Sequence, residues 1–262
     1  MSYQNILFET ADGVARLTLN RPERLNSLNA EMHAEVRAAL ASLKDSAARV
    51  LVITGAGRGF CAGQDLNERA VAPGSAPPDL AASIEKHYKP LVLALRSLQL
   101  PVIAAVNGVA AGAGANIALA CDLVIAARSA SFVQAFSKLG LVPDSGGTWT
   151  LPRLIGTARA LGLTLLGDKL SAEQAAAWGL IWRCVEDDEL AAVVEGLARQ
   201  LAAAPTRALA HTKQAIYEGL SRTLPQQLDV ERDYQGELGH SMDYAEGVAA
   251  FAEKRPPRFT GR

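Results

Sequence analysis

Asp144 is the one acidic side chain between Leu123 and Gly167, and it stands in an apolar, glycine-rich stretch that reads LGLVPDSGGT. A carboxylate among apolar neighbours loses hydration, so its pKa should rise and it can carry a proton near neutral pH. The same residue follows Pro143 and precedes a predicted helix, so it could instead accept a hydrogen bond from the first helical turn as an N-cap. The residue type alone leaves proton transfer and helix capping open.

Two glycine-rich turns directly follow predicted strands and could supply backbone amides to a reacting group. The first spans residues 54–66 (TGAGRGFCAGQDL) and the second spans residues 106–116 (VNGVAAGAGAN). Glycine lets the backbone approach a ligand, and a helix that starts just beyond presents free N–H groups. Two such groups that converge on one carbonyl oxygen form an oxyanion hole, which stabilises an enolate. A plain strand-to-helix turn and close helix packing are the structural alternatives for these stretches.

Other reaction classes lack residues that they require. Gly55 and Gly57 begin a dinucleotide fingerprint, but Phe60 stands where the third glycine belongs, which weakens a dehydrogenase assignment. No base is placed by sequence beside Cys61, so we expect a small buried thiol and not a nucleophile. The histidines have no metal-ligand spacing, so we expect packing or surface roles for His33, His87, His211 and His240.

The elements that would position these groups alternate between strand and helix. An Asp-Gly turn at residues 12–13 predicts a hairpin over residues 6–19, and Asn29 is a plausible N-cap for the helix that follows. Hydrophobic patterns then predict strands at residues 50–54, 102–106 and 123–126 and helices near residues 80–98 and 113–120. This pattern is typical of an α/β core whose strands are buried on both faces.

The C-terminal part is expected to be helical. Strand signals are not seen after Ser171, and helices are predicted at residues 171–178, 190–203, 206–220 and 225–238. We therefore expect residues 1–200 to form the core and residues 201–262 a helical C-terminal region. Residues 73–78, which are rich in proline and glycine, predict a surface loop.

Bulk composition excludes several partners. The chain of 262 residues has 26 basic and 27 acidic side chains, so no global charge attracts nucleic acid or an anionic membrane surface. Three widely spaced cysteines argue against a disulfide framework and for a reducing compartment. The first residues, MSYQN, show no signal-peptide pattern. A cytoplasmic enzyme is the expectation.

Over essentially its whole length the sequence resembles the crotonase superfamily, the enoyl-CoA hydratase and isomerase family. Residues 20–29 (NRPERLNSLN), 59–66 (GFCAGQDL) and 106–122 carry the resemblance. It implies an α/β, crotonase-like spiral of strand-strand-helix turns, with a helical C-terminal region that assembles homotrimers, usually paired into hexamers. It also implies an acyl-CoA thioester substrate, with coenzyme A as part of that substrate, no separate cofactor and no metal.

The resemblance assigns roles to particular residues. The oxyanion-hole amides fall at Gln64 and Ala113, while Ala62, Asp65 and Leu66 would line the coenzyme A side of the site. Alanine at position 113, where glycine is usual in the family, keeps the N–H group and adds a methyl group.

Departures from the family pattern indicate the reaction type. Asn116 and Phe136 stand where hydratases of the family carry two glutamates, and both would contact the acyl group. Hydration needs paired acids, whereas one carboxylate suffices to take a proton from one carbon and return it to another. Asp144 stands where one branch of the isomerases carries its catalytic carboxylate, so the resemblance favours an isomerase with Asp144 as acid and base.

Residues 61–67, 132–149 and 231–235 most resemble a branch that acts in aerobic phenylacetate degradation. This implies isomerisation of a ring-1,2-epoxide to a seven-membered oxepin thioester, with a double-bond shift in an unsaturated acyl-CoA as a second step. Lys213 and Arg58 are candidates for binding the coenzyme A phosphates. A hydratase or hydrolase on the same scaffold remains an alternative, as does a catalytically silent CoA-binding subunit that supports a partner enzyme. An enoyl-CoA hydratase of the same pathway is a candidate partner.

Overall fold

The computed structural model describes residues 3–69 and 78–261, so the expected loop at residues 73–77 lies outside the described chain. The strands are β1 (Ile6–Ala11), β2 (Val14–Leu19), β3 (Val50–Gly55), β4 (Gly59–Cys61), β5 (Val102–Val106), β6 (Val109–Ala111), β7 (Leu123–Ala127), β8 (Ser131–Val133), β9 (Lys169–Ser171) and β10 (Arg183–Val185). The helices are α1 (Ala30–Ser42), α2 (Leu80–Ser83), α3 (Lys89–Ser97), α4 (Ala113–Ala120), α5 (Gly147–Leu166), α6 (Ala172–Ala177), α7 (Leu190–Ala203), α8 (Thr206–Gly219), α9 (Leu224–Leu238) and α10 (Met242–Glu253).

A six-stranded sheet in the order β1-β2-β3-β5-β7-β10 forms the centre of the fold. The predicted hairpin is confirmed, since β1 pairs with β2 in antiparallel register and both turn residues, Asp12 and Gly13, have positive φ. The other neighbours in this sheet are parallel. Strands β3 and β5 are buried almost throughout, as expected for strands covered on both faces.

The expectation that strands end at Ser171 is wrong. Strand β10 pairs in parallel with β7, with Arg183 opposite Ile125. A second sheet of short strands, β4-β6-β8-β9, lies beside the two glycine-rich turns. These strands have three residues each, which is too short for an alternating pattern to be recognised in the sequence.

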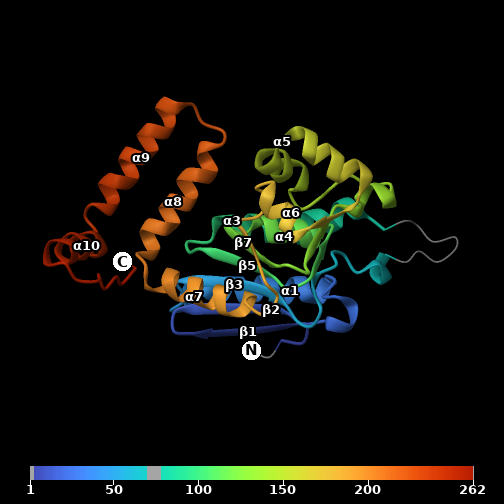
Figure 1. Cartoon of the computed structure of the whole chain (residues 1–262), viewed down its shortest axis with the longest axis horizontal. Coiled ribbons are helices and arrows are strands. Elements are labelled where there is room, and N and C mark those ends of the chain that lie inside the picture. Colours follow the sequence, from blue (N-terminus) through green and yellow to red (C-terminus); the bar gives the residue numbers. More distant parts are fainter. Residues whose placement is uncertain (1–2, 70–77, 262) are drawn as a thin grey trace.

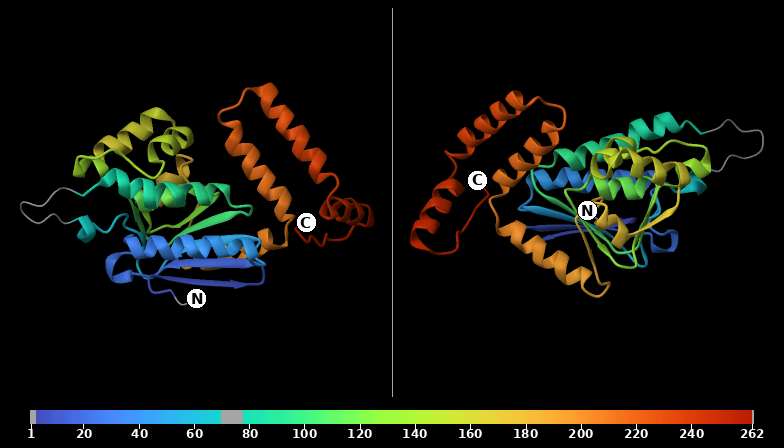
Figure 2. Two further views of the ribbon diagram at one scale, coloured as in Figure 1. Left: turned by 180° about the vertical axis from the view of Figure 1, so that it is seen from behind. Right: turned by 45° about the horizontal axis from the view of Figure 1, so that its top comes forward.

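Helices cover both faces of the six-stranded sheet. Figures 1 and 2 show α7 on one face and α1 on the other. The Asn29 side chain caps α1 by accepting a hydrogen bond from the Met32 amide at 2.8 Å, so the predicted N-cap is confirmed. The helix predicted over residues 80–98 is present but contains a π-helical turn at Ile84–Tyr88 between α2 and α3. Such turns are rare and often occur at functional sites.

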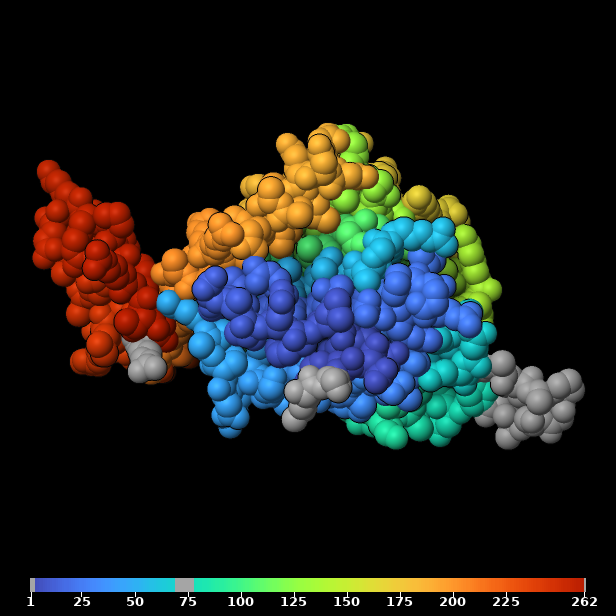
Figure 3. Space-filling view, turned by 90° about the horizontal axis from the view of Figure 1, so that it is seen from below, coloured from blue at the N-terminus to red at the C-terminus, as the bar shows by residue number. Residues whose placement is uncertain are grey.

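Helices α8, α9 and α10 form an arm that projects from one side of the core, and we call these helices the C-terminal arm (Figures 1 and 3). Helix α10 was not predicted from the sequence. Arg49 connects the base of the arm to the core, because its guanidinium donates to Thr206 Oγ1 at 2.9 Å and to the Phe259 carbonyl at 3.0 Å. Across residues 3–69 and 78–261, the helices are too short or too polar to cross a bilayer.

Candidate active site

The first glycine-rich turn, residues 54–66, contains β4, and the part that follows β4 runs beside the segment before α1. The Leu28 amide donates to the Gly63 carbonyl at 2.7 Å, and the Asp65 amide donates to the Leu28 carbonyl at 2.9 Å. The peptide bond between Gly63 and Gln64 is trans, so its carbonyl and its N–H group point in opposite directions. The Gln64 N–H group is therefore directed away from Leu28.

The second glycine-rich turn leads from β6 into α4. Gly112 is the N-cap of this helix with φ of 52°, and its own amide donates to the Val133 carbonyl at 2.8 Å. Ala113 is the first helical residue, and the first N–H groups of an α-helix have no partner within the helix. The predicted start of a helix directly after this turn is confirmed.

The two turns meet at Gly63. A Cβ atom built on Gly63 would lie 2.8 Å from the Ala111 carbonyl oxygen and 3.4 Å from the Ala113 nitrogen. With φ of +89°, Gly63 also has a backbone conformation that other residues rarely adopt. The structure thus brings the segments that hold the Gln64 and Ala113 amides into close contact, and only glycine fits where they touch.

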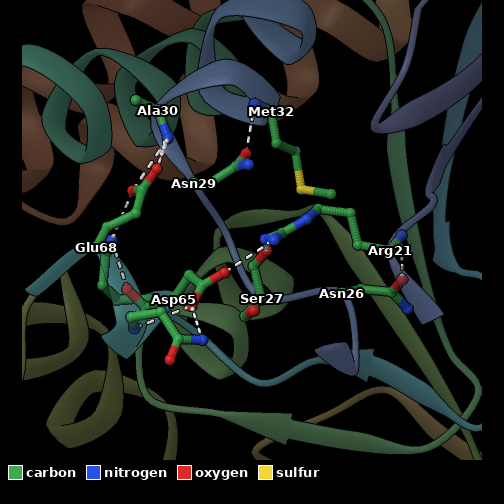
Figure 4. A network of polar contacts seen from close by, with 10 residues as sticks. Arg21, Asn26, Ser27, Asn29, Ala30, Met32, Asp65 and Glu68 are labelled. Atoms are coloured by element: carbon green, nitrogen blue, oxygen red, sulfur yellow. Dashed lines mark hydrogen bonds and ion pairs between the residues drawn. The ribbon is translucent and has the colours of Figure 1, made fainter. Parts of the chain in front are cut away.

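A buried ion pair holds the first turn in place (Figure 4). Arg21 Nη2 lies 2.8 Å from Asp65 Oδ2, while the Asn67 amide donates to Asp65 Oδ1 at 3.1 Å. Burial alone would raise the pKa of Asp65, but the hydrogen bonds and charge of Arg21, together with the Asn67 bonds, hold it below its usual value. The Asp65 side chain is 7% exposed, so it serves this internal pair, whereas Leu66 is exposed beside it.

Gln64 has a second connection through its side chain, because Tyr88 donates a hydrogen bond to Gln64 Oε1. Tyr88 is fully buried at the end of the π-helical turn. No local pattern in the sequence indicates this contact, since its two residues come from separate elements.

Asp144 lies in a tight turn that precedes α5. Ser145 and Gly146 both have positive φ, and the Gly147 amide donates to the Asp144 carbonyl at 2.8 Å. The N-cap position of α5 belongs to Gly146, which offers no side chain to the helix. Asp144 therefore lies two residues before the N-cap and does not occupy the N-cap position considered for it from the sequence. Ser145 Oγ donates to Asp144 Oδ1 at 2.9 Å.

Asn116 and Phe136 connect Asp144 to the second turn. Asn116 lies one helical turn after Gly112 on α4, and its Nδ2 donates to the Asp144 carbonyl at 2.8 Å. The Phe136 ring packs beside Gly112, with its Cζ 3.6 Å from the position of a Cβ built there. Asn116, Phe136 and Asp144 thus gather around the start of α4.

Other sequence-based candidates have different roles. Lys213 is 8% exposed, pairs with Asp122 at 2.9 Å and donates to the Leu95 carbonyl at 3.0 Å, so a role in binding the coenzyme A phosphates is wrong. Arg58 remains exposed. Burial raises the pKa of the Cys61 thiol to about 12, which keeps it protonated and unreactive.

Two histidines that are distant in sequence are neighbours in space. The rings of His33 and His87 stack with centroids 5.0 Å apart. His33 is buried, and burial, followed by the charges of His87 and Arg37, lowers its pKa to about 3. Within the described part of the chain, no group of three or more His, Cys, Asp or Glu side chains could hold a metal ion.

Comparisons with known proteins identify the family. A family model described as enoyl-CoA hydratase/isomerase matches residues 9–262. The chain is 60% identical over 258 residues to a 1,2-epoxyphenylacetyl-CoA isomerase of Escherichia coli, covering 98% of each chain. It is 52% identical over 262 residues to a Rhodobacter capsulatus protein named "probable enoyl-CoA hydratase", covering all of both. An enoyl-CoA hydratase structure from Bacillus anthracis superimposes with a TM-score of 0.93 at 35% identity, covering 99% of this chain and 100% of the other.

Proposed function

Since the chain belongs to the enoyl-CoA hydratase/isomerase family, we propose that it is an acyl-CoA isomerase in which Asp144 moves a proton within the bound thioester. The observation that carries this proposal is the meeting of the two glycine-rich turns at Gly63, which lies against Ala113. Ala113 begins α4, and Asn116 in the same helix contacts the Asp144 carbonyl. That arrangement supports a site at the start of α4 in which two backbone amides and the Asp144 carboxylate act on one substrate.

In this mechanism the thioester oxygen accepts hydrogen bonds from the Gln64 and Ala113 amides. When a proton is removed from the α-carbon, negative charge develops on this oxygen. Two amides already directed at the oxygen stabilise that charge and lower the activation free energy of proton transfer. The positive end of α4 adds to the stabilisation, because Ala113 is its first residue. Ala62 and Leu66 lie beside Gln64, where they would contact the coenzyme A portion.

Asp144 takes the proton as a carboxylate and returns it to another atom of the same substrate as a carboxylic acid. No atom is gained or lost, so the overall reaction is an isomerisation. A hydratase needs a second acid or base to activate water. Asn116 and Phe136 cannot serve in that way, because one is an amide and the other is apolar.

We propose ring-1,2-epoxyphenylacetyl-CoA as the substrate and the oxepin thioester as the product, with a double-bond shift in an unsaturated acyl-CoA as a second activity. The support is the 60% identity to the isomerase from Escherichia coli. The Phe136 ring beside Gly112 gives the acyl side of the site an apolar wall, which suits a cyclic acyl group.

The assembly, location and partners belong to the same proposal. Residues 1–200 would form the catalytic core, and residues 201–262 would join subunits into a homotrimer or hexamer. Large apolar side chains exposed on the C-terminal arm support self-association, with Leu224 72% and Phe251 88% exposed. The free cysteines fit a cytoplasmic location. Coenzyme A would be part of the substrate, with no separate cofactor. An enoyl-CoA hydratase of the same pathway would act on related thioesters.

The test is to incubate the purified protein with the ring epoxide thioester and with a panel of enoyl-CoA thioesters. Reactions in deuterium oxide and in ¹⁸O-water are followed by mass spectrometry for mass and carbon skeleton. The proposal expects the epoxide thioester to give an isomer of unchanged composition, with deuterium only at exchangeable carbon positions. Incorporation of ¹⁸O into the initial product would identify a hydratase or hydrolase, and no conversion or exchange would identify a silent CoA-binding subunit.

A further inference from the structure

The Asn116 side chain has both polar ends bound by protein atoms beside the proposed catalytic carboxylate. Its Nδ2 donates to the Asp144 carbonyl at 2.8 Å, and its Oδ1 accepts from Gln134 Nε2 at 2.7 Å. Asn116 is 2% exposed and Gln134 is 1% exposed, so water does not compete with these bonds. A buried amide with both ends bonded is held in one orientation.

The chemistry of the partners fixes that orientation. A backbone carbonyl can only accept, so Asn116 must direct its NH₂ group to Asp144 and its oxygen to Gln134. Gln134 must then present its own NH₂ group, as it does. The three residues form a directional chain from Gln134 through Asn116 to the peptide group of Asp144.

The Asp144 carbonyl is bound from two sides. It accepts from Asn116 Nδ2 and from the Gly147 amide, each at 2.8 Å. These two bonds use both lone pairs of the oxygen and fix the plane of the peptide group that follows Asp144. Because Ser145 already has φ of 51°, which is unfavourable for a serine, the turn needs such external support.

Gly147 allows Asn116 to approach because it has no side chain. A Cβ atom built there would lie 2.5 Å from Asn116 Nδ2 and 2.9 Å from Asn116 Cγ. Gly147 is helical with no positive φ, so this glycine is required by the close approach of Asn116 and not by its backbone conformation.

We infer that Asn116 is a positioning residue for Asp144. The Gln134 side chain orients the Asn116 amide, and Gly147 leaves room for it because it has no side chain. The bond from Asn116 to the Asp144 carbonyl then holds the turn so that the carboxylate reaches the substrate. This inference rests on the proposed function of Asp144 as acid and base. A displacement of about 1 Å at a reacting group can cost about 100-fold in rate. Loss of the Asn116 contact should therefore lower kcat more than it weakens substrate binding.

The test compares Asn116→Ala, Gly147→Ala and the double variant as full-length protein. Each single variant is expected to lower kcat about 10- to 100-fold, with KM and the affinity for acetyl-CoA within about 2-fold of the wild type. In the double variant the methyl group introduced at position 147 fills space that the Asn116 side chain has vacated. The kcat of the double variant should therefore equal that of Asn116→Ala. A double variant whose kcat falls by the product of the two single losses would overturn the inference.

Two further variants keep the outcome decisive. Gln134→Met, which has a side chain of similar length, removes the donor to Asn116 Oδ1 and should lower kcat even if Asn116→Ala fails to fold. Ser42→Ala removes a 2.7 Å bond to the Ala39 carbonyl at the end of α1 and should leave kcat unchanged. If Asn116→Ala and Gln134→Met lose only thermal stability and keep wild-type kcat, the inference fails while the proposed function stands. If Asp144→Asn retains full turnover, the proposed function itself fails.

Discussion

The Leu28 amide bonds to the Gly63 carbonyl at 2.7 Å, and this bond directs the next N–H group, that of Gln64, to the opposite side of the chain. A residue outside the proposed oxyanion hole thus determines the direction of one of its two donors. Gly63 itself lies against the Ala111 carbonyl and the Ala113 nitrogen.

Gly63→Ala should separate the two amides. The new methyl group would lie 2.8 Å from the Ala111 oxygen, and alanine is strained at φ of +89°. We expect unfolding free energy to fall by about 2 kcal/mol and kcat by about 100-fold, as for loss of one oxyanion donor. Thermal unfolding and steady-state kinetics measure both.

Gly196→Ala is the matched control for that variant. Nothing lies within 4 Å of a Cβ atom at Gly196, which is exposed within α7. Alanine there should stabilise the protein by about 0.5 to 1 kcal/mol and leave kcat unchanged. Equal kcat losses at both glycines would contradict the specific role of Gly63.

Cys61→Ala tests the absence of thiol chemistry. The thiol is buried and its pKa is raised to about 12, so it is not a nucleophile at neutral pH. We expect kcat within about 2-fold of the wild type and a stability loss of about 1 kcal/mol. A loss of turnover without a loss of structure would show that Cys61 takes part in the reaction.

His33 should make the fold sensitive to mild acid. Its pKa is about 3 in the folded state against an ordinary 6.5, so below pH 6.5 the unfolded chain binds a proton that the folded chain refuses. Stability is therefore lost as the pH falls from 6.5 towards 3, by about 1.4 kcal/mol per pH unit. Denaturant unfolding at pH 6 and pH 5 should show a smaller loss for His33→Phe than for the wild type.

The exposed His240 provides the comparison for this measurement. His240→Gln should follow the wild-type dependence on pH, since the effect comes from burial. If His33→Phe shows the same fall as the wild type, another group causes the acid sensitivity.

The sequence predicts the long elements better than the contacts between them. The Asn29 cap and the start of α4 at Ala113 follow from local chemistry, and both are found in the structure. Strand β10 and the π-helical turn at Ile84–Tyr88 depend on tertiary packing and have no local signal.

The same distinction applies within the site. Asp144 is conspicuous in the sequence as an isolated acid. The sequence does not reveal where the following helix begins, because the turn at Ser145 and Gly146 places the N-cap two residues after Asp144. Gln134 could not be predicted as a partner of Asn116, since 18 residues and two sheet strands separate them. Lys213 was misassigned because a sequence does not reveal that Asp122 faces it.

The central claim is that Asp144 carries the proton, and turnover of Asp144→Asn tests it most directly. Asparagine keeps the shape of the side chain but cannot exchange a proton, so kcat should fall about 1,000-fold while the thermal unfolding midpoint and acetyl-CoA affinity stay near the wild type. Asp168→Asn, an exposed aspartate whose side chain is 75% accessible, should keep full activity. Wild-type turnover in well-folded Asp144→Asn would contradict the account.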